Sequence, residues 1–64
     1  MKPNNFYVDE KVEWTDINDT IHTGTIVEYS YDIMQMSNKY LIKLSTGQYI
    51  TKWEYELRRV ENGR

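Results

Sequence analysis

The stretch 39–52, KYLIKLSTGQYITK, constrains the fold most, because its pattern predicts a β-hairpin in one definite register. Apolar and polar side chains alternate up to a three-residue loop that ends in Gly47, where a positive φ is needed. This loop pairs Ile42 with Ile50 on one buried face, whereas a two-residue loop would place Lys43 beside Ile50 and bury a charge. The same register predicts an outer face with the pairs Lys43–Tyr49, Leu41–Thr51 and Lys39–Trp53. Basic and aromatic groups in a row indicate a binding surface rather than a catalytic site.

The other segments predict a small all-β domain. We expect strands at 11–14, 22–31 and 58–60, a loop at 16–20 and a single 3-10 turn within 53–57, before the last strand. The inward positions form the expected core: Val12, Trp14, Ile26, Tyr40, Ile42, Leu44, Ile50, Leu57 and Val60. Gly24 predicts a bulge or sharp bend in the long second strand. Residues 1–64 are interpreted as one domain with its core in 10–60 and a frayed end at 61–64.

This order of elements resembles the small SH3-like barrels, especially those of the Tudor, chromo-barrel and KOW type. The segments that carry the resemblance are Val12-Glu-Trp14, Gly24-Thr-Ile26, Tyr40-Leu-Ile-Lys-Leu-Ser-Thr-Gly47 and Trp53-Glu-Tyr-Glu-Leu57-Arg58. It implies a strongly bent, five-stranded barrel. Tudor-like domains often bind methylated or basic peptides in an aromatic cage, and KOW-type domains bind nucleic acid or the ribosomal and transcription machinery. The opening motif of proline-binding SH3 domains is poorly matched by Phe6-Tyr-Val-Asp9.

Charge and composition narrow the classes of partner. The net charge is −2, but residues 1–32 hold two lysines and seven acidic residues, while residues 33–64 hold six basic and three acidic residues. This basic half is not dense enough to indicate nucleic acid by charge alone. The chain has no cysteine, which excludes disulfides, thiolate zinc sites and cysteine nucleophiles. Without a signal-peptide pattern or a long apolar run, we expect a cytoplasmic protein that does not enter membranes.

Catalytic patterns are poorly represented. His22 is the single histidine, and the serines lack the spacing of a nucleophile elbow. The segment 16–20 alternates oxygen-bearing side chains but lacks the glycine and the distant glutamate of a calcium-binding EF-hand loop. The isolated glycines form no phosphate-binding loop. We therefore expect a protein that is not an enzyme and that has neither a metal nor a cofactor.

Aromatic residues and methionines are the candidate contact groups. Some of the rings should fill the core, as Trp14 and Tyr40 do in the predicted register. The candidate binding residues are Tyr29, Tyr31, Met34, Met36, Tyr49 and Trp53. Three or so rings with an acid nearby (Asp32, Glu28 or Glu54) would suit a quaternary ammonium group. The methionines either cover an open barrel end, which we favour, or form an exposed patch for a protein partner.

Two functional hypotheses follow. The first is a protein-interaction module that binds a protein or peptide through the aromatic and methionine residues. Its small size and composition are similar to those of accessory proteins of phages and mobile elements, which favours a regulator or inhibitor of a larger host protein. The alternative is a nucleic-acid-binding barrel whose cations are Lys39, Lys43, Lys52, Arg58 and Arg59.

Overall fold

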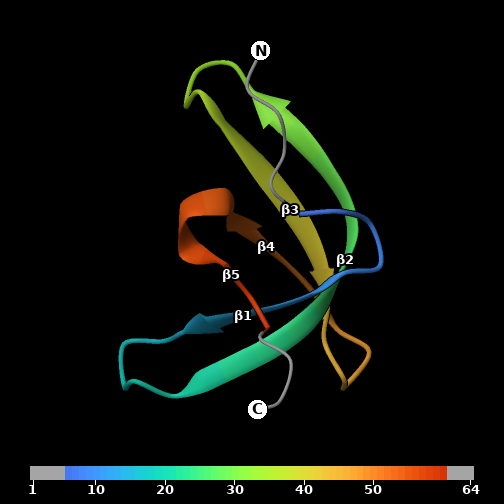
Figure 1. The fold of residues 1–64 in the computed structure, drawn as a ribbon, viewed down its shortest axis with the longest axis vertical. Helices are drawn as coiled ribbons and strands as arrows, with labels where there is room; N and C mark the ends of the chain where they lie inside the picture. The colour runs from blue at the N-terminus through green and yellow to red at the C-terminus, as the bar shows by residue number, and fades with distance from the viewer. Residues whose placement is uncertain (1–5, 61–64) are drawn as a thin grey trace.

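The computed structural model describes residues 6–60 and shows one antiparallel sheet. The elements are β1 (Lys11–Thr15), β2 (Ile21–Asp32), β3 (Ser37–Lys43), β4 (Tyr49–Trp53), the 3-10 turn η1 (Glu54–Glu56) and β5 (Arg58–Arg59). Their order in the sheet is β4-β3-β2-β1-β5 (Figure 1). The predicted all-β class and the single 3-10 turn before the last strand are confirmed. Within residues 6–60 no pairing joins β4 to β5, so hydrogen bonds do not close the sheet into a barrel.

The hairpin between β3 and β4 has the predicted register. Ile42 pairs with Ile50, and Lys39 pairs with Trp53. The Leu44 N–H donates to the Gln48 carbonyl over 2.8 Å, and Gly47 has φ 92°. A glycine at this position is required because other residues rarely adopt that conformation. Alternation of side chains and one turn residue were therefore sufficient to predict this hairpin.

β2 is the longest strand, with 12 residues, and it curves through the whole molecule in Figure 1. Its first part pairs with β1 and its second part with β3. The register shifts between Ile26 and Glu28, so the bulge lies at Val27 and the prediction of a bulge at Gly24 was wrong. Gly24 instead allows close packing, because an added Cβ would lie 2.3 Å from the Cγ2 of Ile42.

The bulge at Val27 decides which way the second half of β2 faces. With strict alternation, Tyr29 would lie on the opposite face of the sheet from Ile26. The extra residue at the bulge reverses this alternation. Ile26 pairs with Ile42 and Tyr29 pairs with Tyr40, so Tyr29 lies on the same face as the core residues. Tyr31 follows on that face, where it pairs with Asn38.

The core is small and lies on the inner face of the curved sheet. Among residues 6–60, seven apolar residues are buried: Phe6, Val12, Trp14, Ile26, Tyr40, Ile42 and Leu57. The predicted core members Leu44 and Ile50 are partly buried against this cluster, and Val60 is half-buried. Phe6 was missed because it precedes the first strand and belongs to no alternating pattern. Its ring packs edge-on against Tyr40, with the ring centroids 5.5 Å apart.

Buried polar groups connect the edges of the sheet to its centre. The buried Glu54 carboxylate accepts hydrogen bonds from the Asn38 amide over 3.0 Å and from the Tyr40 hydroxyl over 2.8 Å. These bonds join η1 to β3. The buried Glu13 in β1 accepts a bond of 3.2 Å from the guanidinium of Arg58, which joins β1 to β5. Charged groups thus connect η1 to β3 and β1 to β5.

Candidate binding surfaces

The predicted aromatic and methionine residues do not form one cluster. Tyr49 and Trp53 lie on the outer face of β4, in the same cross-strand rows as Lys43 and Lys39. Tyr29 and Tyr31 lie on the inner face of β2 because of the bulge. The methionines lie in the turn between β2 and β3. The structure therefore divides this set among three places and forms no aromatic cage from it.

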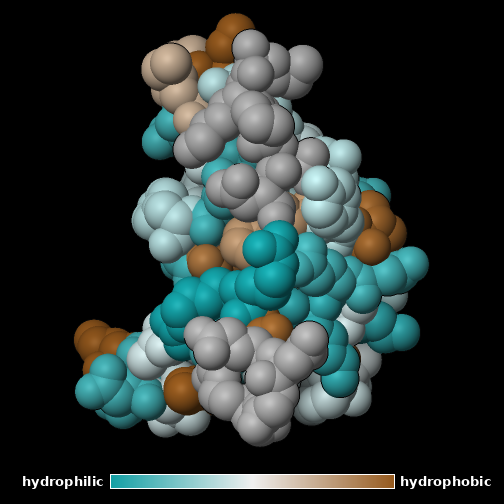
Figure 2. Space-filling view, viewed as in Figure 1, coloured by the Kyte–Doolittle hydropathy of each residue, from teal (hydrophilic) through white to brown (hydrophobic). Residues whose placement is uncertain are grey.

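The turn between β2 and β3, which we call the hairpin tip, consists of Ile33, Met34, Gln35 and Met36. The side chains of Ile33, Met34 and Met36 are 78%, 86% and 71% exposed. In Figure 1 the tip lies at one end of the long axis, and Figure 2 shows hydrophobic atoms there. The prediction that this loop covers an open barrel end was wrong, because none of these three side chains packs on the core.

The backbone of the hairpin tip is held in one shape by Asp32. Its Oδ1 accepts hydrogen bonds from the N–H groups of Met34 over 2.9 Å and of Gln35 over 3.0 Å. Such a turn around an aspartate is a common local arrangement. Met36 has φ 52°, a conformation that favours glycine or asparagine over methionine. An apolar residue is thus present where folding alone favours a different one.

Two tyrosines extend the apolar surface from the hairpin tip toward the core. Tyr29 is 44% exposed, and its ring centroid lies 5.9 Å from that of the buried Tyr40. Tyr31 is half-buried and lies two residues closer to the tip on the same strand. The inner face of this hairpin therefore carries two tyrosines between the core and the exposed hairpin tip.

Three of the five predicted cationic residues are bound to acids. Lys52 lies 3.6 Å from Glu56, Arg58 is paired with Glu13, and Arg59 is paired with Glu10. The hydrogen bond from Arg59 lowers the pKa of the Glu10 carboxyl below its ordinary value of 4.5. These cations connect parts of the fold. Lys52 pairs with Tyr40 and Arg59 pairs with Val12, so both lie on the inner face, away from Lys39 and Lys43. Arg58 pairs with Glu13 and lies on the outer face, where its guanidinium is bonded to that acid.

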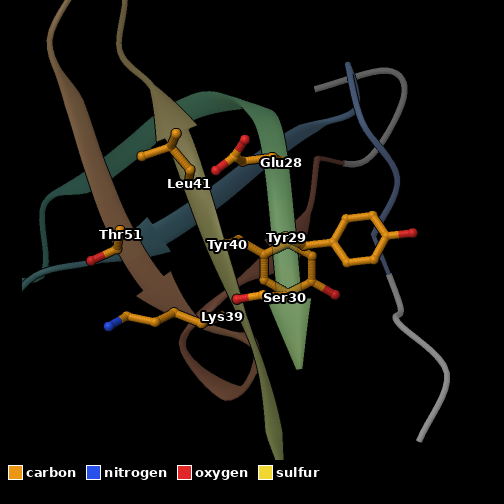
Figure 3. A pocket seen from close by; sticks show the side chains of 7 residues that line it. All are labelled: Glu28, Tyr29, Ser30, Lys39, Tyr40, Leu41 and Thr51. Carbon is orange, nitrogen blue, oxygen red and sulfur yellow. The ribbon is translucent and has the colours of Figure 1, made fainter. Parts of the chain in front are cut away.

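Lys39 and Lys43 lie on the outer face of β3, as predicted. In the part of the chain that the structure describes, neither forms an ion pair. The Nζ of Lys39 lies 5.2 Å from the centroid of the Trp53 ring, which suits a cation–π contact. Lys39 also borders a shallow hollow of about 180 Å³ with Glu28, Ser30, Leu41 and Thr51. In Figure 3, Lys39, Leu41 and Thr51 lie on one side, while Tyr29 points away from them.

The acids proposed for a cage have different surroundings. Glu54 is buried and bonded to Asn38 and Tyr40, while Asp32 holds the hairpin tip. Glu28 is exposed and borders the hollow beside Lys39. These three acids thus lie in three different parts of the structure.

His22 lies beside Asp16, and its Nε2 is 2.7 Å from Asp16 Oδ2. The hydrogen bond with His22 lowers the pKa of the Asp16 carboxyl, and bonds from the N–H groups of Thr20 and Asn18 add to this effect. The imidazole also stacks on Trp14, with centroids 5.9 Å apart. Within residues 6–60, no three side chains of His, Asp or Glu gather where they could hold a metal ion.

Comparison with known proteins gives no relative: no family model, no curated protein and no solved structure matches the chain. Across residues 6–60 there is also no helix with the length and apolar character needed to cross a membrane.

Proposed function

We propose that this protein is a non-enzymatic interaction module that docks on a larger protein through the hairpin tip, and that it regulates or inhibits that partner. The observation that carries the proposal is the exposure of Ile33, Met34 and Met36 on a turn ordered by Asp32. Full burial of one such side chain by a partner contributes about 1.5–3 kcal/mol. Because the turn is already ordered, little conformational entropy is lost on binding. Methionines adapt their shape to a partner surface.

Tyr29 and Tyr31 extend this contact surface along the inner face of β2. Tyrosine is common at interface hot spots because it buries a large ring and keeps a polar hydroxyl. Tyr49 and Trp53 lie on the other face of the sheet, and we leave them out of this contact. The proposed interface is thus narrower than the predicted set of six residues.

We further propose that the fold is a small SH3-like barrel of the Tudor or KOW type. The support is the strand order β4-β3-β2-β1-β5, with one long curved strand shared by both halves of the sheet. The 3-10 turn η1 directly before β5 also agrees with this proposal.

The test uses a tip variant with Ile33→Thr, Met34→Ser and Met36→Asn. Threonine keeps the β-branch, and asparagine tolerates the positive φ of Met36. The matched control is Ile17→Thr, because Ile17 is 99% exposed in the loop between β1 and β2. Each tagged protein is used to recover partners from host lysate, and the recovered protein is then purified and its affinity measured.

We expect the wild type and the Ile17→Thr control to bind the same partner with equal affinity, and the tip variant to lose it. Retention of that partner by the folded tip variant would contradict the proposal. Equal loss in the tip variant and the control would also contradict it, because loss would then not be specific to the hairpin tip.

A further inference from the structure

A second hollow lies on the outer face, across β1, β2 and β3. Its volume is about 210 Å³ and its polar lining consists of Lys11, Thr23, Thr25, Lys43 and Ser45. We call it the lysine hollow. It is lined by two lysines and three hydroxyl-bearing residues, and no acidic side chain among residues 6–60 lines it. These are donor groups, and they suit an anion.

Strand pairing explains why the two lysines lie on the same face of the sheet. Thr25 pairs with Lys11 on one side and with Lys43 on the other, so the three residues form one row across the sheet. Directly paired residues share a face, and neighbouring strands lie about 4.8 Å apart. The Cα atoms of the two lysines are therefore about 10 Å apart with a threonine hydroxyl between them. Two flexible lysine stems can direct their ammonium groups to one phosphate over that distance.

The lysine hollow keeps its positive charge in the folded protein. Neither Lys11 nor Lys43 forms an ion pair with any residue in the described range 6–60. The acid nearest in register is Glu13, which pairs with Thr23. Glu13 is buried, and the guanidinium of Arg58 is bonded to it. Its charge is thus balanced by Arg58, and the two lysines remain available.

Aromatic rings lie next to the lysines on the same face. The exposed Tyr49 is the cross-strand neighbour of Lys43, and Trp53 is the cross-strand neighbour of Lys39. These two lysine–aromatic pairs are four residues apart, or about 13 Å along the strand. Cations that meet phosphates beside rings that stack on bases are typical of surfaces that bind single-stranded nucleic acid.

We propose that the lysine hollow binds a phosphate group of a single-stranded nucleic acid, and that Tyr49 stacks on the adjoining base. The site is distinct from the hairpin tip, so either proposal can fail without the other. The negative net charge of the protein gives little long-range attraction. Binding is therefore weak at physiological salt and strengthens as salt is lowered.

The test is a titration of the ¹⁵N-labelled protein with an oligothymidylate of about ten nucleotides at low salt, followed by NMR. Thymidine monophosphate and inorganic phosphate are titrated separately. We expect the oligonucleotide to shift the amide signals of Lys11, Thr25, Lys43 and Tyr49 and to leave those of residues 33–36 unchanged. The two small ligands should shift the signals around Thr25 only, and at much higher concentration.

Variants then assign the contacts. Lys11→Gln and Lys43→Gln each remove one charge from the hollow, and we expect about tenfold weaker binding of the oligonucleotide. The slope of log K against log salt should also fall by about 0.7 for each lost phosphate contact. Lys52→Gln is the matched control, since it removes the same charge from a lysine already paired with Glu56. Tyr49→Ser should weaken binding of the oligonucleotide and leave the affinity for inorganic phosphate unchanged.

Several results would overturn the proposal. Absence of any shift at low salt would exclude the site. If Lys52→Gln and Lys43→Gln weakened binding of the oligonucleotide equally, only the overall charge of the protein would matter. If thymidine monophosphate bound as tightly as the oligonucleotide, the phosphate would come from a free nucleotide and the single-strand assignment would be wrong.

Discussion

The cationic residues that are paired with acids and those that line the lysine hollow have different roles although all of them carry a positive charge. Arg58, Arg59 and Lys52 are each paired with an acid and connect elements of the fold. Lys11 and Lys43 have no such pairing within residues 6–60 and line an open hollow. The comparison shows that position in the sheet, rather than composition, separates structural charges from those that can meet a ligand.

The largest effect is expected at the buried Glu54. Glu54→Ala leaves the Asn38 amide and the Tyr40 hydroxyl without this acceptor. Loss of this acceptor costs roughly 1–3 kcal/mol for each of the two buried donors, which together is a large part of the stability of a small domain. Urea unfolding followed by circular dichroism measures the loss. Glu28→Ala, at an exposed position on the outer face, is the control; equal losses in both variants would contradict a structural role for Glu54.

A smaller loss is expected for Gly24→Ala. The new methyl group would lie 2.3 Å from the Cγ2 of Ile42, so the core must shift. Overpacking of this kind costs about 1–3 kcal/mol. Ile42→Ala removes the clashing methyl group and by itself costs about 2–5 kcal/mol. The double variant should therefore lose less than the sum of the two single losses in a double-mutant cycle. Simple additivity would show that the two residues are not in contact.

The ion pair of Glu10 and Arg59 predicts a dependence of stability on pH. The pKa of Glu10 is lowered in the folded protein, so the pair contributes stability above the ordinary value of 4.5. That contribution is lost as pH falls through the lowered value. Glu10→Gln should thus be less stable than the wild type at neutral pH, and the difference should disappear in acid. Urea midpoints measured from neutral to strongly acidic pH test this, and a constant difference would contradict it.

The outer lysines should have the smallest effect among the charged groups. Lys11→Gln and Lys43→Gln are expected to change the free energy of unfolding by less than about 0.5 kcal/mol, because neither side chain is part of an ion pair in residues 6–60. Thermal unfolding is sufficient to check this. A loss of stability as large as that expected for Glu54→Ala would contradict this prediction and show that these lysines stabilise the fold.

Part of the fold could be predicted from local patterns. The alternation around Ile42 and Ile50 and the glycine at position 47 determine the β3–β4 hairpin and its outer face. The bulge at Val27 has no comparable signal, because no glycine or proline marks it. It places Tyr29 and Tyr31 on the inner face, so these tyrosines do not share a face with Tyr49 and Trp53.

The candidate sites were predicted less well than the strands. The partners of Arg58 and Arg59 are acids more than forty residues away in sequence, Glu13 and Glu10. Burial of Glu54 likewise depends on the distant Asn38 and Tyr40. Contacts between distant segments leave no periodic pattern. The exposure of the methionines could not be predicted, because a short loop gives no signal for the direction in which its side chains point.

The proposed function depends on the hairpin tip being exposed and unnecessary for folding, and one measurement tests this directly. It is the free energy of unfolding in urea of the tip variant, Ile33→Thr with Met34→Ser and Met36→Asn, compared with the wild type. Because all three side chains are more than two-thirds exposed, we predict a difference of less than about 0.5 kcal/mol. A loss of about 2 kcal/mol or more, typical of buried apolar side chains, would show that the tip packs on the core and would contradict the account.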